Sequence, residues 1–146
     1  MSIHLNRDLD SLHQHIMQMC AVVEQLVQKA VQQLSQPNPS QSEQLVAADD
    51  EIDRWDVRIE EECLKILALH QPVAQNLRRV TAVMKISWEL ERVADVAVNI
   101  AERAAGLAGA PGLPVPDKLL QMAEAAVEML RLALDAFVQK LSLIHI

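Results

Sequence analysis

Aromatic side chains are almost missing from this sequence, which has one Phe, two Trp and no Tyr among its 146 residues. Sheet-rich folds depend on aromatic and β-branched side chains that pair across strands, so the shortage argues against such folds. Glycine is also scarce, with three residues, and this leaves few positions for tight turns. The apolar residues are mainly Leu, Ala, Val, Ile and Met, a composition that favours long helices.

Paired cysteines, a signal peptide and a membrane-spanning segment are also missing. Cys20 and Cys63 stand alone within helical patterns, which predicts two buried, inert thiols in a reducing compartment. The first twelve residues are too polar for a signal peptide. The longest uncharged apolar stretch, residues 104–116, contains three prolines and cannot span a bilayer as a helix. We therefore expect a cytoplasmic protein with no direct membrane insertion.

The formal net charge of −7 argues against nucleic-acid binding, because phosphate contacts require a basic surface. The sequence also lacks a Gly-rich phosphate loop and the G-x-S-x-G and H-E-x-x-H motifs. A di-metal carboxylate enzyme needs a His three residues after a Glu, and none of the five His is so placed. These absences predict that the protein is not an enzyme and that its natural electrostatic partner is a cation or a basic protein surface.

Four segments repeat apolar residues at alternating steps of four and three, as helices in a bundle do. The first ends at Pro37 and Pro39, and Ser40 or Ser42 is the expected cap of the second, which covers about 41–69. The third covers about 72–105, and Asp117 is the expected cap of the fourth. The first segment has the clearest seam: Leu5, Leu9, Leu12, Ile16, Met19, Val23, Leu26 and Ala30.

Because the connections are short, neighbouring helices must run antiparallel. The predicted fold is therefore all-α: an antiparallel three-helix bundle (1–106), a Gly/Pro linker (107–116) and a fourth long helix (117–146). The apolar face of the fourth helix predicts either self-association into a homo-oligomer or packing over the first three helices. The final LSLIHI breaks the polar alternation, so the helix frays there or the chain is truncated with a foreign end.

Acidic residues form an unusual row in the second helix. Asp49, Asp53, Asp56 and Glu60 recur at steps of four, three and four, immediately beside the apolar stripe. In the third helix a second stripe begins with Leu77, Val80, Met84 and Trp88 and continues with Glu91, Asp95 and Asn99. A carboxylate at a semi-buried position must be neutralised, paired or bound to a cation.

The two acidic pairs stand at similar distances from the turn that joins their helices. Asp53 is about 17 residues before this turn and Glu91 about 20 residues after it, so antiparallel packing brings them to the same height. Asp49, Asp53, Glu91 and Asp95 then supply four oxygen ligands, a set that suits Fe, Mn or Mg better than Cu. The alternative is a solvated acidic face on which Arg54, Arg58 and Arg92 pair locally.

Several runs in the second and third helices resemble the signature of the PhoU family. They are QPVAQNLR (71–78), KI (85–86), ELERVAD (89–95) and NI (99–100), together with Asp49, Ile52, Asp53 and Cys63 upstream. The resemblance covers about residues 5–138. Asn76 stands where the family usually has Asp, and Ala94 where it usually has Gly; neither change removes a proposed ligand.

The resemblance implies a cytoplasmic bundle built from two similar three-helix repeats, of which this chain would hold one and the first helix of the next. It implies metal clusters, most often of iron, bound by E/D-x-x-x-D motifs that map to Asp49 and Asp53 and to Glu91 and Asp95. Mn, Mg and Zn are the alternative metals. It further implies an adaptor that links a phosphate ABC transporter to a sensor histidine kinase and represses the phosphate-starvation response. The rival interpretation is a structural helical protein-interaction domain without metal.

Overall fold

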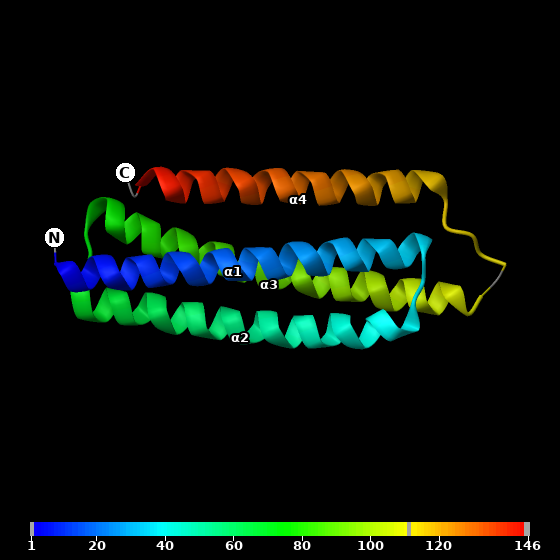
Figure 1. Cartoon of the computed structure of the whole chain (residues 1–146), viewed down its shortest axis with the longest axis horizontal. Helices are drawn as coiled ribbons and strands as arrows, with labels where there is room; N and C mark the ends of the chain where they lie inside the picture. The colour runs from blue at the N-terminus through cyan, green and yellow to red at the C-terminus, as the bar shows by residue number, and fades with distance from the viewer. Residues whose placement is uncertain (1, 111, 145–146) are drawn as a thin grey trace.

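The computed structural model describes residues 2–110 and 112–144, and four long helices contain most of them (Figure 1). The helices are α1 (Ile3–Ser35), α2 (Pro39–His70), α3 (Ala74–Ala108) and α4 (Asp117–Ile144). Each helix runs antiparallel to the one before it (Figure 1). The predicted all-α bundle of three helices with a fourth long helix is confirmed.

The first two helices begin at capping side chains. The Ser2 hydroxyl accepts a hydrogen bond from the His4 amide at 3.2 Å, and the Asn38 side chain accepts one from the Ser40 amide at 3.1 Å. The prediction that Ser40 or Ser42 caps α2 is wrong. Pro39 has no amide hydrogen to leave unpaired, so it takes the first helical position and Asn38 becomes the cap.

The turn between α2 and α3 delays the start of α3 to Ala74, two residues after Pro72. Gln71 adopts a left-handed conformation with φ of 43°, and Val73 is extended. A left-handed residue ends the hydrogen-bonded spiral of α2 and reverses the chain within three residues. This short turn holds α2 and α3 side by side over most of their length.

The Gly/Pro segment between α3 and α4 is shorter than expected, because α3 continues to Ala108 through Gly106. The fourth helix begins at Asp117, whose carboxylate lies in the first turn, where the helix dipole favours a negative charge. The Pro116 carbonyl accepts hydrogen bonds from the Leu119 and Leu120 amides. Asp117 is therefore the first helical residue and not the cap.

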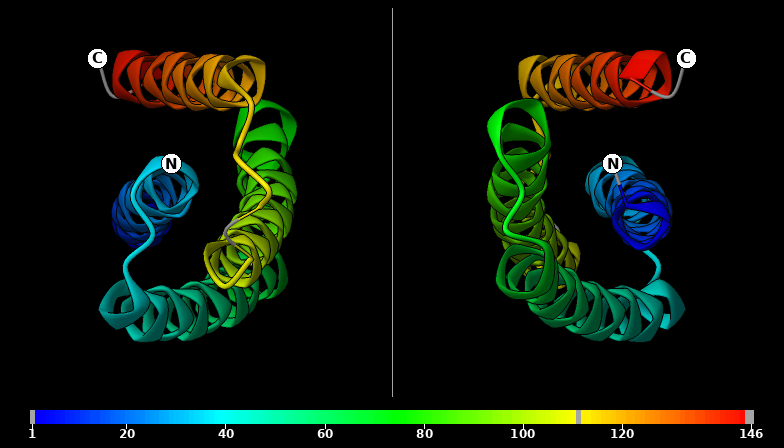
Figure 2. Two further views of the ribbon diagram at one scale, coloured as in Figure 1. Left: turned by 90° about the vertical axis from the view of Figure 1, so that its right-hand side faces the viewer. Right: turned by 90° about the vertical axis from the view of Figure 1, so that its left-hand side faces the viewer.

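The core lies around α1, which contacts each of the other three helices (Figure 2). Every residue of the predicted α1 seam is buried, and Ile16, Met19, Val23 and Ala30 have no exposed surface. Leu45, Ile52, Ile59 and Ile66 of α2 face this seam. Cys20 and Cys63 are buried free thiols, and burial raises the pKa of each to about 12, as expected for inert cysteines.

The apolar repeat of α3 predicts a buried face of Val83, Ile86, Leu90, Val93, Ala97, Ile100 and Ala104. Four of these residues are buried: Val83, Leu90, Ala97 and Ala104. Small side chains, Ser87, Ala94 and Ala101, occupy the centre of the buried face, whereas Ile86 and Val93 are only half-buried. α3 packs against both α1 and α2, and small residues fit the narrow space between two neighbouring helices. As a result Trp88 is 44% exposed, and Asp95 and Asn99, which were expected on a semi-buried stripe, are exposed.

Helix α4 packs along α1, one of the two outcomes expected for it. In the described part of the chain its close backbone contacts are with α1 alone, and Leu134 is among its buried residues. The end-on views show α4 beside α1 and across from α2 (Figure 2). None of the described helices combines the length and the apolar character needed to cross a membrane.

Candidate metal centre

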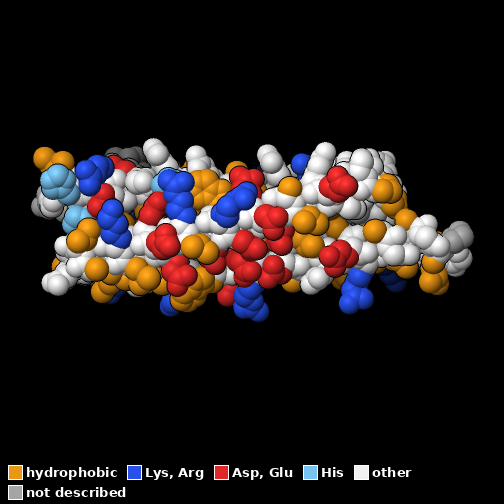
Figure 3. Space-filling model, turned by 90° about the horizontal axis from the view of Figure 1, so that it is seen from below, with side chains coloured by type: hydrophobic (Ala, Val, Ile, Leu, Met, Phe, Trp, Pro, Cys, Tyr) orange, Lys and Arg blue, Asp and Glu red, His pale blue; other side chains and the backbone are white. Residues whose placement is uncertain are grey.

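Three of the four predicted ligands converge between α2 and α3. Asp49 and Asp53 lie one turn apart on α2, and Asp95 lies on the neighbouring α3. Each contributes one carboxylate oxygen to a group in which all oxygens lie within 4.8 Å of one another. Acidic side chains gather near the middle of the face that contains α2 (Figure 3). The helical step of four residues and the antiparallel pairing of α2 and α3 together produce this arrangement.

The fourth predicted ligand, Glu91, lies beside this group but is not part of it. It is half-buried, one turn before Asp95 on α3. Burial raises the pKa of Glu91, and the charge of Asp95 and a hydrogen bond with its carboxyl raise it further. We refer to Asp49, Asp53, Glu91 and Asp95 as the acidic cluster.

The acidic cluster carries an electrostatic cost. Burial raises the pKa of Asp49, and the charges of Asp53, Asp95 and Asp50 raise it further. Burial also raises the pKa of Asp53, and the charge of Asp95 adds to the effect. The Asp49 Oδ1 atom is buried and has no hydrogen-bond partner. A buried carboxylate oxygen normally has a donor or a cation beside it, so this atom is where a ligand is most clearly needed.

Basic residues do not neutralise the cluster. Arg58 pairs with Glu62 at 3.3 Å and Arg92 pairs with Glu89 at 3.4 Å, so two of the three local arginines have other partners. Within residues 2–110 and 112–144, no ion pair joins a Lys or Arg to any of the four acids. Local pairing therefore leaves the negative charge of the cluster in place.

The geometry fits one hard cation. Oxygen ligands of such ions lie at about 2.0–2.6 Å, so two ligands on one ion can be separated by up to about 5 Å. The separations within the group of Asp49, Asp53 and Asp95 fall inside this limit. All donors are carboxylate oxygens, which favour Mg, Mn or Fe over thiophilic metals. Asp53 and Asp95 are exposed, so solvent can reach the site and complete the coordination.

Asp56 is a further acid that the four-residue prediction leaves out. Its Oδ1 accepts a hydrogen bond of 2.6 Å from the Ser87 hydroxyl, and its charge raises the pKa values of Asp53 and Glu91. Ser87 is 1% exposed and so bridges the core and the acidic cluster. The sequence shows Asp56 as a member of the acidic row of α2. Its hydrogen bond with Ser87 could not be predicted from the sequence, because the two residues lie on different helices.

Histidines lie on a different side of α2, at its contact with α1. His15 pairs with Glu62 at 2.7 Å, and His70 pairs with Asp8 at 2.9 Å. All four side chains are between 15% and 24% exposed. We call these four residues the paired seam. It contains one acid for each histidine and shares no residue with the acidic cluster.

The chain was compared with protein families and with proteins of known structure. Residues 16–104 match the family described as the PhoU domain. A phosphate-specific transport system accessory protein PhoU homolog from Aquifex aeolicus is 35% identical over 136 residues, which are 93% of this chain and 62% of that protein. A homolog of the same description from Zymomonas mobilis is 38% identical over 133 residues, 90% of this chain and 56% of that protein.

A solved structure supports the same relationship. The crystal structure of PhoU from Pseudomonas aeruginosa superposes with a TM-score of 0.87 at 32% sequence identity, covering 92% of this chain and 65% of that one. The chain thus spans less than two thirds of the length of these relatives. The matched residues include α2 and most of α3, and with them the acidic cluster. The chain belongs to the PhoU family.

Proposed function

We propose that this protein is a metal-binding regulatory adaptor of phosphate uptake and not an enzyme. The observation that carries the metal-binding part is the buried, unpartnered Asp49 Oδ1 beside Asp53 and Asp95. A hard cation at this point would satisfy that atom and reduce the repulsion among the three carboxylates. Iron is the first candidate because of the family resemblance, and Mn, Mg and Zn are the alternatives.

The regulatory part of the proposal rests on the family. The relatives named above are accessory proteins of a phosphate-specific transport system. We propose that this chain, acting in the cytoplasm, meets the phosphate ABC transporter and the sensor histidine kinase and represses the phosphate-starvation response. The net charge of −7 supports protein partners over nucleic acid.

The proposed metal site is tested with the double variant Asp53→Asn/Asp95→Asn. Denaturant melts are recorded on the variant and the wild type, with chelator and with Fe(II) or Mn(II). Without metal the variant should be the more stable protein, because it removes two repelling charges. With metal the order should reverse, since a ligand in 100-fold excess over its Kd adds about 2.7 kcal/mol to the folded state.

A matched control removes two acids from the same helices outside the cluster: Glu51→Gln/Glu102→Gln, both at exposed positions. Its melts should follow the wild type within about 0.5 kcal/mol in both conditions. If wild type, test variant and control give coincident midpoints with and without metal, the acids are only a solvated face. The rival interpretation, a helical interaction domain without metal, would then replace the metal-dependent one.

A further inference from the structure

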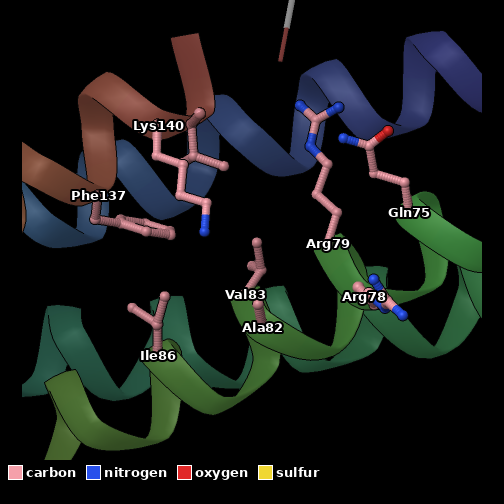
Figure 4. A pocket seen from close by; sticks show the side chains of 9 residues that line it. Gln75, Arg78, Arg79, Ala82, Val83, Ile86, Phe137 and Lys140 are labelled. Atoms are coloured by element: carbon pink, nitrogen blue, oxygen red, sulfur yellow. The ribbon is translucent and has the colours of Figure 1, made fainter. Parts of the chain in front are cut away.

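A second candidate site lies between α3 and α4, away from the acidic cluster. It is a cavity of about 400 Å³ near the beginning of α3 and the end of α4. Figure 4 shows Phe137 and Lys140 extending from α4 toward α3, where Val83 and Ile86 face them. In the same view Arg79 rises from α3 next to Gln75, with Val83 between it and Lys140. In the part of the chain that the structure describes, α3 and α4 both flank α1 without close backbone contact with each other, and the cavity lies between them.

The charge of this cavity is opposite to that of the whole molecule. Arg78, Arg79 and Lys140 line it, and its lining contains no carboxylate among the residues described. The formal net charge of the chain is −7, with 13 Lys and Arg against 20 Asp and Glu. Three of the 13 cations therefore gather at one cavity. Charges of one sign in a recess bounded by low-dielectric walls attract ligands of the opposite sign.

Arg79 is the most enclosed of these cations. It is half-buried, whereas Arg78 and Lys140 are exposed. Burial lowers the pKa of Arg79, and the negative charge of Asp10 on α1 opposes that shift. Asp10 offsets part of the positive charge of Arg79, and Arg78 and Lys140 are further cations of the described lining. A partly desolvated guanidinium binds an oxyanion more strongly than one in water, and its planar fork suits the oxygens of a phosphate.

The remaining wall is apolar. Val83 is buried, Ile86 and Phe137 are half-buried, and their side chains face the cavity beside Lys140 (Figure 4). Phe137 is the single Phe of the chain. Ligand sites of small molecules combine an apolar wall with a few polar groups and have volumes of about 300–1,000 Å³. Inorganic phosphate would fill a small part of this space and would leave the apolar wall in contact with water.

We propose that this cavity binds a nucleoside phosphate, with the phosphate held by Arg79 and Lys140 and the base against Phe137. Arg78 lies at the rim and adds to the attraction. An aromatic ring stacked on Phe137 covers apolar surface that is otherwise wet. The inference is independent of the metal proposal, because Glu91 and Asp95 lie further along α3, between α3 and α2. It assigns a small-molecule site to an otherwise acidic protein.

The test measures binding of AMP to the whole chain by equilibrium dialysis in excess chelator, so that metal at the acidic cluster does not contribute. Adenosine, which lacks the phosphate, and inorganic phosphate, which lacks the base, are measured beside it. AMP should bind saturably at one site per chain. Adenosine should bind at least about tenfold more weakly, since a hydrogen bond to a charged group contributes a factor of about ten or more. Inorganic phosphate should also bind about tenfold more weakly, because it lacks the base that stacks on Phe137.

Variants locate the site. Lys140→Gln and Arg79→Gln should each weaken AMP binding about tenfold or more, and Phe137→Ala should weaken AMP but leave inorganic phosphate unchanged. Lys118→Gln on α4 and Arg103→Gln on α3 are matched controls at exposed positions outside the cavity, and they should bind AMP as the wild type does. Because Arg79 is half-buried, thermal melts of its variant are recorded, and the exposed Lys140 carries the conclusion if Arg79→Gln unfolds.

Three results would overturn the proposal. One is the absence of saturable AMP binding, and another is AMP binding that Lys140→Gln leaves intact. The third is inorganic phosphate or adenosine binding as tightly as AMP, which would remove either the base or the phosphate from the interaction. None of these results bears on the metal melts described above, so the two proposals fail separately.

Discussion

Helix α2 has acidic side chains along two of its edges, and the two edges differ in how this negative charge is balanced. On the side of α1, the paired seam places Glu62 at 2.7 Å from His15 and His70 at 2.9 Å from Asp8. On the side of α3, the acidic cluster brings Asp49, Asp53 and Asp95 within 4.8 Å of one another. At the first edge each acid has a histidine partner within the chain, whereas the second edge has surplus negative charge. This difference is the reason why we propose a metal ion at the second edge and none at the first.

An apolar stripe lies between the two edges of α2. A substitution in this stripe gives the largest expected change in stability, with which the changes at the two edges are compared. Ile59 has no exposed surface and lies on the core side of α2. Ile59→Ala should lower the free energy of unfolding by about 2–5 kcal/mol, through lost burial and the cavity left behind. Denaturant melts check this value, and the loss should be the same with and without metal. A loss that depended on metal would mean that the core and the acidic cluster are not independent.

A lysine side chain within the acidic cluster would give its carboxylates a cationic partner, as the histidines do in the paired seam. Asp95→Lys places an ammonium beside Asp53 and Glu91, and in chelator it should raise the free energy of unfolding by about 1 kcal/mol. The same variant should lose the stabilisation that metal gives the wild type. Glu102→Lys, at an exposed position of α3 outside the cluster, is the control for the same change in charge. A metal response that survives Asp95→Lys would contradict the proposed ligand set.

The two edges should respond to pH with opposite signs. In the acidic cluster the folded-state pKa values of Asp49, Asp53 and Glu91 are raised, so the folded protein binds more protons than the unfolded one at pH values above the ordinary 3.8 and 4.5. The stability of the metal-free protein should therefore rise as pH falls from neutral into that window. The slope should be smaller in Asp53→Asn/Asp95→Asn.

Asp8 of the paired seam has the opposite shift. The hydrogen bond from His70 lowers its pKa, and Arg7 contributes to the same effect. Its stabilising contribution is present above the ordinary value of 3.8 and is lost as pH falls through the lower folded-state pKa. Melts between neutral pH and about pH 3 should thus show a maximum, with the rise due to the acidic cluster and the fall due to Asp8. A monotonic fall from neutral pH would contradict the raised pKa values.

The smallest expected effect belongs to single pairs of the paired seam. Glu62→Gln removes the partner of His15 and Arg58, and should cost about 0.2–1 kcal/mol because the pair is partly solvated. Arg58 keeps its position over the Trp55 ring, 5.3 Å from the centroid, which limits the loss. High salt should reduce the difference between variant and wild type. A loss of more than about 2 kcal/mol in the free energy of unfolding would contradict this expectation, because it would equal the effect of truncating a core side chain.

Sequence periodicity predicted the apolar seam of α1 correctly, because an uninterrupted apolar repeat has one possible inner face; the buried Gln33 was not predicted. On α3 it predicted only part of the buried face, since Ser87 and Ala94 are buried and look like spacers in the sequence. Small residues carry little hydrophobic signal, and only the packing of α3 between two helices shows that they face inward. The acidic pair on each helix could be predicted in the same way as the α1 seam, because both depend only on the spacing of residues along one helix.

The sequence predicted that the acids of the second and third helices meet at one height, and Asp49, Asp53 and Asp95 do converge. It could not predict which side chains at a helix contact face inward, nor which residues pair across it. Asp95 was expected on a semi-buried stripe and is exposed, because the crossing of α2 and α3 decides which acids face inward. The pairing of His15 with Glu62 joins residues 47 positions apart, and no spacing rule connects them. The cavity at Arg79 and Lys140 likewise depends on how α4 settles on α1. Each of these features was fixed by tertiary packing and not by local periodicity.

Among the described residues, α4 makes close backbone contacts with α1 and with no other helix, and this has a consequence for how the molecule unfolds. The other three helices each make such contacts with two or more neighbours, so none can separate without breaking the central core. Helix α4 can detach with a smaller loss of packing, which makes it a unit of partial unfolding with a lower opening free energy than the bundle. Amide hydrogens of α4 should therefore exchange with solvent earlier than those of α1, even under conditions where the protein remains fully native.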